Sequence, residues 1–180
     1  MLAAARLGAG WALEALYRWL APAVIGYLRL QGVEDPEDLS SEVFLGAFRN
    51  LAGFEGDHQA FRSWTFAIAH RRVVDDRRRR ARRPQAAEVE ASALEFAGGD
   101  DTEAEALARL SGEAVMTLCE RLSADQRDVV LLRLVADLSL EETAAALGKS
   151  TGAVKALQHR AVACLRKEMQ EKNLKEGVSR

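Results

Sequence analysis

A segment of cationic and small residues near the end of the chain has the chemistry needed to read double-stranded DNA. On a helix, its small residues lie beside Lys155, so the backbone can approach the base edges closely. Lys155 can donate to guanine O6 and N7 or to a phosphate, and the helix N-terminus at Thr151 can hold a phosphate. The candidate DNA-binding residues of this segment are Ser150, Thr151, Gly152, Lys155, Ala156, His159 and Arg160.

A second concentration of functional side chains lies in the middle of the chain. Residues 71–83 contain eight Arg and two Asp, a local charge of +6. Such a run is typical of a solvated or phosphate-binding face. Phe61 and Trp64 precede it, and a basic helix beside aromatic rings suits unpaired nucleic acid, whose bases stack on the rings. Packing in the core is nevertheless the favoured interpretation of these two aromatics.

The DNA-reading segment needs a scaffold, and the residues before it predict one. Ser123 and Ser139 are expected to cap two short helices, and Glu142 completes a capping box with Ser139. The turn at residues 147–150 then joins the second of these helices to the last one, as in a helix-turn-helix. Ser150 or Thr151 caps this last helix, which is predicted to run to about residue 170. Its apolar arc, expected to pack on the two preceding helices, contains Val154, Leu157, Ala161, Cys164 and Leu165.

The arginine-rich segment also lies among predicted helices. An amphipathic helix is expected at about residues 11–31. Asp35 and Pro36 have the form of an N-cap and first turn, and apolar spacing continues that helix to about residue 51. Residues 50–58 are predicted to be a loop, and residues 59–83 a helix that stops before Pro84. A further helix is expected at about residues 103–121. No strand is predicted, so the fold class is all-α.

The charge distribution divides the chain into blocks. Residues 1–83 have a net charge of +3, residues 84–105 of −7 and residues 106–180 of +2. The acidic block contains Gly98 and Gly99 and no clear periodicity, which predicts a flexible linker. We therefore expect two small helical domains, 1–83 and 106–170, with a linker at 84–105 and a tail at 171–180.

The composition of the chain argues against several classes of protein. With 48% hydrophobic and 29% charged residues, the chain has the profile of a folded soluble protein. Cys119 and Cys164 have no partner at metal-ligand spacing, which favours a reduced, cytoplasmic setting. No apolar run has the length of about 20 residues that a membrane span needs, so no membrane insertion is expected. We find no glycine-rich phosphate loop and no catalytic constellation, and we predict no enzyme activity, metal or cofactor.

Three motifs together resemble a known family. DPEDLSSEVFLGAFRN (35–50), FRSWTFAIAHRRVVDDRRR (61–79) and LSADQRDVVLLRLVADLSLEETAAALGKSTGAVKALQHRA (122–161) are similar to the second and fourth regions of bacterial extracytoplasmic-function (ECF) sigma factors. The resemblance covers about residues 11–168. Three motifs in the expected order are far more specific than one.

The resemblance implies a function: the chain would bind RNA polymerase core and direct it to promoter DNA. The N-terminal domain would open the −10 element and capture a flipped base in the loop at 50–58, and the C-terminal domain would read the −35 element as duplex. Asp38 and Glu42 would face a coiled coil of the polymerase, with Leu39 and Phe44 nearer the core of the domain. The residues implied in core binding are Asp35, Asp38, Leu39, Glu42 and Phe44. Those implied in −10 binding are Asn50, Phe54, Arg62, Trp64, His70, Arg71, Arg72, Asp75, Arg78 and Arg79.

Other functions are weighed against this one. A plain transcriptional regulator would explain the helix-turn-helix but not the arginine-rich helix together with the DPEDL segment. A protein that only sequesters partners would need no base-reading residues. Asp75 and Asp76 are interpreted as partners of neighbouring arginines rather than as metal ligands. Family habit also implies that an anti-sigma factor holds the chain inactive.

Overall fold

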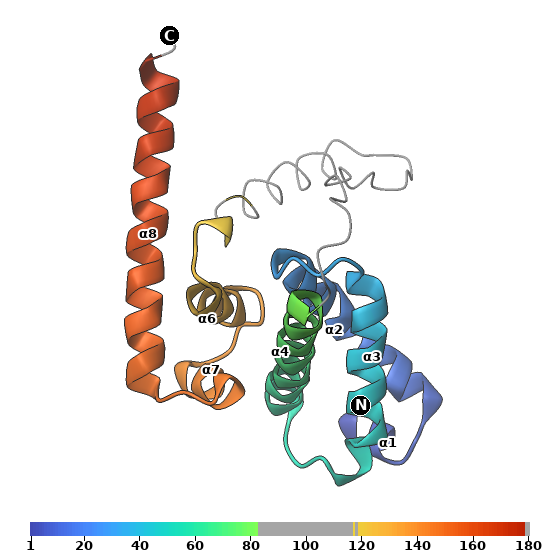
Figure 1. Cartoon of the computed structure of the whole chain (residues 1–180). Coiled ribbons are helices and arrows are strands. Elements are labelled where there is room, and N and C mark those ends of the chain that lie inside the picture. Colours follow the sequence, from blue (N-terminus) through green and yellow to red (C-terminus); the bar gives the residue numbers. More distant parts are fainter. Residues whose placement is uncertain (83–116, 118, 179–180) are drawn as a thin grey trace.

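The computed structural model describes residues 1–82, 117 and 119–178, and this part of the chain consists of helices and connecting loops (Figure 1). The predicted all-α fold is confirmed, with no strand among these residues. In chain order the helices are α1 (Leu2–Arg6), α2 (Gly10–Leu30), α3 (Pro36–Arg49), the 3₁₀ turn η1 (Leu51–Gly53), α4 (His58–Arg82), α6 (Ala124–Leu134), α7 (Leu140–Leu147) and α8 (Thr151–Val178).

The N-terminal unit, residues 1–82, is built by α2, α3 and α4 packing on one another. The start of α3 is set as its sequence predicts, because the Asp35 side chain accepts a hydrogen bond from the Asp38 backbone N–H at 2.9 Å and Pro36 occupies the first turn. Large side chains with essentially no exposure fill the space between the helices. They are Leu16, Leu20, Val24, Tyr27, Leu28, Val43, Leu51, Phe61 and Phe66.

Helix α1 was not predicted from the sequence. Its five residues are too few for a periodic pattern, and a helix this short is not stable by itself. Packing stabilises it, because Leu2 and Ala5 are buried in the N-terminal core. Gly8, at a φ of +80°, then allows the sharp turn into α2.

The C-terminal unit, residues 119–178, has the predicted local signals. Ser123 with Gln126 and Ser139 with Glu142 form complete capping boxes at the starts of α6 and α7. The prediction that α8 ends near residue 170 was wrong, since the helix continues to Val178. Residues 170–176 are good or neutral helix formers, and the first strong breaker is Gly177.

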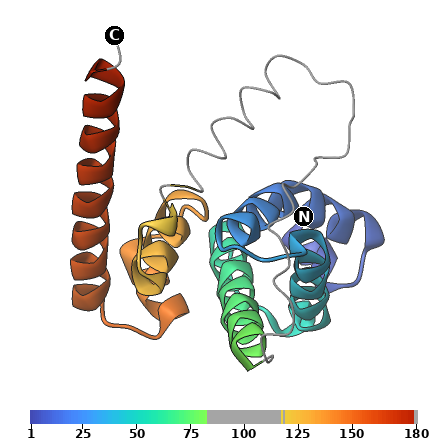
Figure 2. The same ribbon diagram turned by 45° about the horizontal axis from the view of Figure 1, so that its top comes forward.

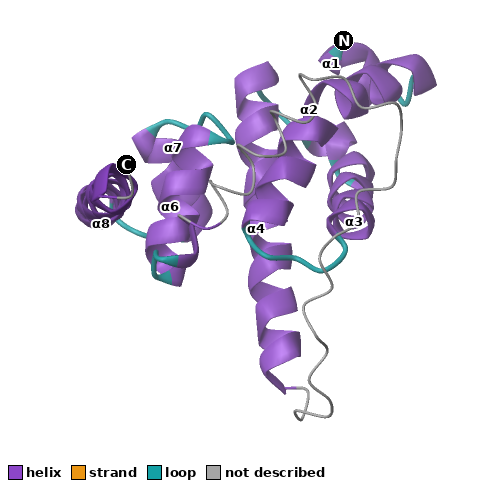
Figure 3. Ribbon diagram, turned by 90° about the horizontal axis from the view of Figure 1, so that it is seen from above, coloured by secondary structure: helices purple, strands orange, loops and turns teal. Residues whose placement is uncertain are grey.

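The two units are not separate bodies in this structure. Helices α6 and α7 lie beside α4, with α8 on the outer side (Figures 2 and 3). One apolar cluster continues from the N-terminal core into the C-terminal unit through Leu131, Leu132, Ala136 and Leu138, all nearly fully buried. Because these apolar side chains are withdrawn from water, the hydrophobic effect favours the packing of the two units on each other, which we call the closed arrangement.

Two expectations lie wholly or largely outside the described residues: the linker at 84–105 and most of the helix at 103–121. Among the helices that the structure describes, none has both the length and the apolar character required to cross a membrane.

Candidate nucleic-acid interfaces

The helix-turn-helix is formed by α7 and α8. Gly148 ends α7 in the left-handed conformation at φ +62°, and the Lys149 backbone N–H closes the turn on the Ala144 carbonyl at 3.0 Å. Ser150 is the cap of α8, because its Oγ accepts from the Ala153 N–H at 3.2 Å. This settles the choice between the two cap candidates.

The first turns of α8 present the predicted DNA-reading face. Val154 and Ala161 are fully buried against α6 and α7, which fixes the rotation of the helix about its axis. All seven candidates are exposed: Ser150, Thr151, Gly152, Lys155, Ala156, His159 and Arg160. The prediction that Gly152, Lys155, Ala156 and His159 point away from the packed side of the helix agrees with this exposure, and the contact of all seven residues with DNA stays a prediction.

An aromatic stack lies where the loop at 50–58 meets α4. The Phe54 ring stacks on Trp64 with centroids 5.0 Å apart and planes 20° from parallel. Phe61 touches both rings and is fully buried, as the core interpretation expected, whereas Trp64 is only partly buried. The Asn50 amide donates to the Gly46 carbonyl of α3 at 2.8 Å.

Several arginines at the C-terminal end of α4 form ion pairs with acids of the N-terminal unit. Arg78 pairs with Asp75 at 3.7 Å, and Asp76 pairs with Arg79 at 3.5 Å. The interpretation of Asp75 and Asp76 as partners of arginines is thus confirmed. Arg72 crosses to Glu42 of α3 at 3.1 Å, and Arg71 is exposed. The Arg78–Asp75 and Arg72–Glu42 pairs are exposed, and exposed pairs contribute at most about 1 kcal/mol each.

Two predicted −10 residues are engaged inside the molecule: Arg62 bonds to the C-terminal unit, and His70 is buried against Tyr27 of α2. Arg62 donates from Nε to the Ala136 carbonyl and from a terminal nitrogen to the Val135 carbonyl at 3.0 Å. His70 is only 8% exposed, and its Nδ1 lies 3.2 Å from the Tyr27 hydroxyl. Burial lowers the pKa of His70 below the ordinary value of 6.5. Neither side chain is available to DNA while the two units are packed together.

Beside His70 lies a buried polar network that the sequence did not indicate. Asp128 of α6, 5% exposed, accepts from Gln31 Nε2 at 2.9 Å and from Arg77 at 3.1 Å. Gln31 also donates to the Tyr27 hydroxyl at 3.0 Å. Burial is the main cause that raises the pKa of Tyr27 well above its ordinary value. The network joins α2, α4 and α6 across the two units.

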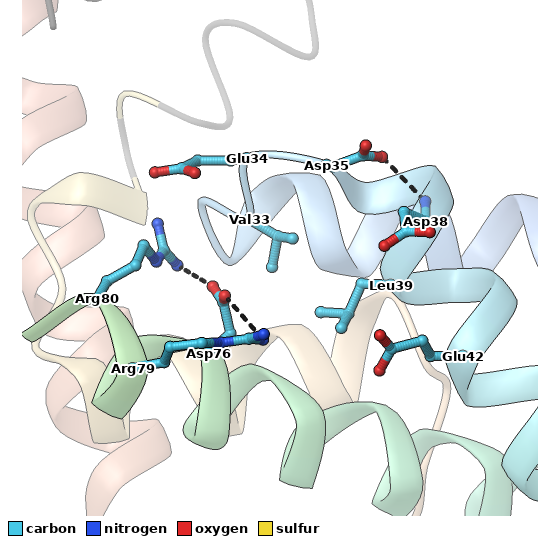
Figure 4. Close-up of a pocket in the computed structure, with 9 residues that line it drawn as sticks. All are labelled: Val33, Glu34, Asp35, Asp38, Leu39, Glu42, Asp76, Arg79 and Arg80. Carbon is cyan, nitrogen blue, oxygen red and sulfur yellow. Dashed lines mark hydrogen bonds and ion pairs between the residues drawn. The ribbon is translucent and has the colours of Figure 1, made fainter. Parts of the chain in front are cut away.

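The predicted core-binding residues lie around the start of α3. A cavity of about 190 Å³ opens between this end of α3 and the C-terminal half of α4 (Figure 4). Acidic residues outnumber the two arginines in its lining, which comprises Val33, Glu34, Asp35, Asp38, Leu39, Glu42, Asp76, Arg79 and Arg80. Asp35 and Asp38 are exposed. Leu39 and Phe44 are only 6% and 2% exposed and belong to the hydrophobic core of the N-terminal unit. This burial agrees with their predicted place nearer the centre of the domain.

Comparisons with known proteins match both units. The family model described as Sigma-70 region 2 matches residues 14–83, and that described as Sigma-70, region 4 matches residues 119–167. The chain is 33% identical over 164 residues to the ECF RNA polymerase sigma factor SigD of Mycobacterium tuberculosis, covering 88% of this chain and 77% of SigD. The chain belongs to the ECF sigma factors.

Other sigma factors are also similar to the chain over most of its length. ECF RNA polymerase sigma factor BldN of Streptomyces coelicolor is 34% identical over 155 residues, which are 84% of this sigma factor but only 55% of BldN. RNA polymerase sigma factor YlaC of Bacillus subtilis is 29% identical over 92% of this chain and 96% of its own. The resemblance found from the three sequence motifs is therefore confirmed.

A solved structure similar to this sigma factor is that of CnrH in complex with the cytosolic domain of CnrY. The two superpose with a TM-score of 0.68 at 25% identity, over 94% of this chain and 95% of CnrH. The likeness thus extends over both helical units.

Proposed function

We propose that this chain binds RNA polymerase core and directs it to specific promoters, with the N-terminal unit opening the −10 element and the C-terminal unit reading the −35 element. The observation that carries the proposal is the pairing, in one sigma-family chain, of an exposed base-reading face on α8 with an aromatic stack beside an arginine-rich helix. One surface suits duplex DNA and the other suits unpaired DNA.

For the −35 element, α8 would enter the major groove by its first two turns. Lys155 would donate to a guanine or a phosphate, with Gly152 and Ala156 allowing close approach. Arg160 and His159 would extend the contact along the groove or to the backbone. The burial of Val154 and Ala161 supports this orientation, since it leaves the opposite side of the helix to the DNA.

For the −10 element, α4 and the loop before it would bind the non-template strand after the duplex opens. The partly buried Trp64 and Phe54 would offer a ring surface for an unpaired base. Asn50 and the loop would form the pocket for a flipped base. Arg71, Arg72, Arg78 and Arg79 would neutralise phosphates, with Asp75 keeping Arg78 in place.

Polymerase core would bind at the start of α3. Asp35, Asp38 and Glu42 line the acidic cavity, and their carboxylates suit a basic surface on the partner. Leu39 and Phe44 would act by holding α3 in position from beneath. Domain boundaries at 83 and 106 are part of the same proposal.

The packed arrangement of the two units would have to open before both promoter elements are bound. Arg62 and His70, both proposed for −10 binding, are held against the C-terminal unit or the core. We propose that an anti-sigma factor binds the chain in the closed form and delays this opening. The similarity to CnrH, solved with the cytosolic domain of CnrY, supports a protein partner for such a form.

A reconstituted transcription assay tests the function. Purified chain and polymerase core are combined with a genomic promoter library, and the selected promoters are compared with versions that lack the −35 element. Lys155→Ala is expected to reduce transcription from intact promoters about tenfold, as for the loss of one good base contact, and to have no effect where the −35 element is absent. Binding of the chain to DNA but not to core polymerase would refute the proposal and favour a plain regulator.

A further inference from the structure

Helix α1 lies before the part of the chain that the sigma region 2 model matches, which begins at residue 14. It nevertheless packs directly on η1, within the loop proposed to receive the flipped base. Leu2 and Ala5 anchor it in the core, so its last residue, Arg6, is held in a defined place.

The Arg6 side chain makes two contacts with this loop. Its guanidinium donates to the Gly56 carbonyl at 2.9 Å, and its central carbon lies over the Phe54 ring, 5.6 Å from the centroid. Phe54 in turn stacks on Trp64. Arg6 is thereby linked, through one ring, to the aromatic surface proposed for an unpaired base.

The loop has a backbone conformation at Gly56 that favours glycine. This residue has a φ of +141°, and a Cβ added there would lie 2.6 Å from the Ala60 Cβ. The next residue, Asp57, is fixed at the start of α4, where its carboxylate accepts from the Ala60 N–H at 2.8 Å. The end of the loop is thus held from two sides, by Arg6 of α1 at the Gly56 carbonyl and by the hydrogen bond of Asp57 at the start of α4.

Arg6 also has hydrogen-bonding capacity to spare. Its Nε is buried and has no hydrogen-bond partner among the described residues. A guanidinium that stacks on an aromatic ring and donates to one carbonyl can still direct its remaining N–H groups to an incoming acceptor.

We infer that Arg6 is a positioning residue of the −10 site: it sets the shape of the loop at 50–57 and so helps to determine which unpaired base the site accepts. The inference rests on the proposed function. It adds α1, outside the matched family region, to the elements that determine promoter choice.

The test compares Arg6→Ala and Arg6→Lys with the wild type in holoenzyme. Arg18→Ala is the matched control, since Arg18 is an exposed cation on α2 whose recorded partner is Glu14, one turn away. Transcription is measured from promoters carrying each of the four bases at every −10 position, on duplex templates and on templates already opened at the −10 element. Thermal unfolding and binding to core polymerase are measured for each variant.

Arg6→Ala is expected to reduce the preference for the favoured base at one −10 position about fivefold, equivalent to about 1 kcal/mol, on both template types. Arg6→Lys restores part of this preference, because an ammonium can still donate to the Gly56 carbonyl but lacks the planar stack. Core binding is expected to stay at the wild-type level. Thermal unfolding is expected to change little, because Leu2 and Ala5 still anchor α1.

Three results would overturn the inference. One is an unchanged base preference in Arg6→Ala, and another is the same change in Arg18→Ala. The third is an equal loss on all promoters that follows a lower melting temperature, which would assign Arg6 a purely structural role. Failure of the wild-type chain to initiate with core polymerase would instead reject the proposed function itself, and the inference with it.

Discussion

Replacing Asp128 with Ala should open the closed arrangement of the two units. Asp128 accepts from Gln31 at 2.9 Å and from both terminal nitrogens of Arg77, at 3.1 and 3.4 Å. The Asp128 side chain is 7% exposed and that of Arg77 26%. Asp128→Ala therefore leaves a largely buried guanidinium and the Gln31 amide without their shared acceptor.

The magnitude follows from the burial of the pair. Removing one partner of a buried ion pair costs about 3–5 kcal/mol. Arg77 retains a quarter of its exposure and can regain water, so we expect about 2 kcal/mol, a shift of about thirtyfold toward the open form. A double variant, Arg77→Met with Asp128→Leu, should recover much of the loss because it leaves no unpaired buried charge.

The assay is small-angle X-ray scattering of the purified chain, together with hydrogen exchange of the α4 amides. Asp128→Ala should enlarge the radius of gyration and lower the protection of α4. Asp125→Ala is the matched control, because Asp125 is an exposed carboxylate on the same helix that pairs with Lys149 inside the C-terminal unit. Equal scattering and equal exchange in the two variants would refute the reasoning.

Further predictions concern stability. Burial lowers the pKa of His70, so the unfolded chain binds more protons than the folded chain as pH falls below 6.5. The free energy of unfolding should therefore decline below this pH. Urea titrations of His70→Gln should show a smaller decline. An unaltered pH profile in that variant would show that another group is responsible. Gly56→Ala should lower the stability of the N-terminal unit by about 1–3 kcal/mol, because of the positive φ and the contact with Ala60, and an unchanged melting temperature would contradict this. Ser139→Ala should cost about 1 kcal/mol, whereas Ser139→Asp, which keeps the cap, should cost much less; equal losses would remove the capping argument.

Local signals accounted for the elements with well-defined ends. Asp35 and Ser139 lie at the cap positions that their neighbours in sequence predicted, and each side chain bonds to a backbone N–H three residues ahead. The exposed face of α8 followed from helical periodicity, since Val154 and Ala161 are apolar at the spacing that one packed side requires. Where no breaker marked an end, as in the last turns of α8, the prediction stopped too early.

The candidate site was predictable only in part. Trp64 and the exposed arginines of α4 could be proposed from type and position, but nothing in their neighbourhood showed that Arg62 would bond to carbonyls of the C-terminal unit. Arg6 was missed for a similar reason, because its contact with Gly56 joins residues 50 positions apart.

The sequence by itself determined the longer helices, the caps of α3, α6 and α7, the family and the residues with DNA-reading chemistry, because each of these depends on side chains within a few positions of one another. Only the tertiary structure decided that the two units share a core and that Asp128 meets Gln31, 97 positions away, and Arg77. Such a meeting depends on how whole helices pack, and the energy of a buried charge is set by the partners and the solvent exclusion that this packing creates.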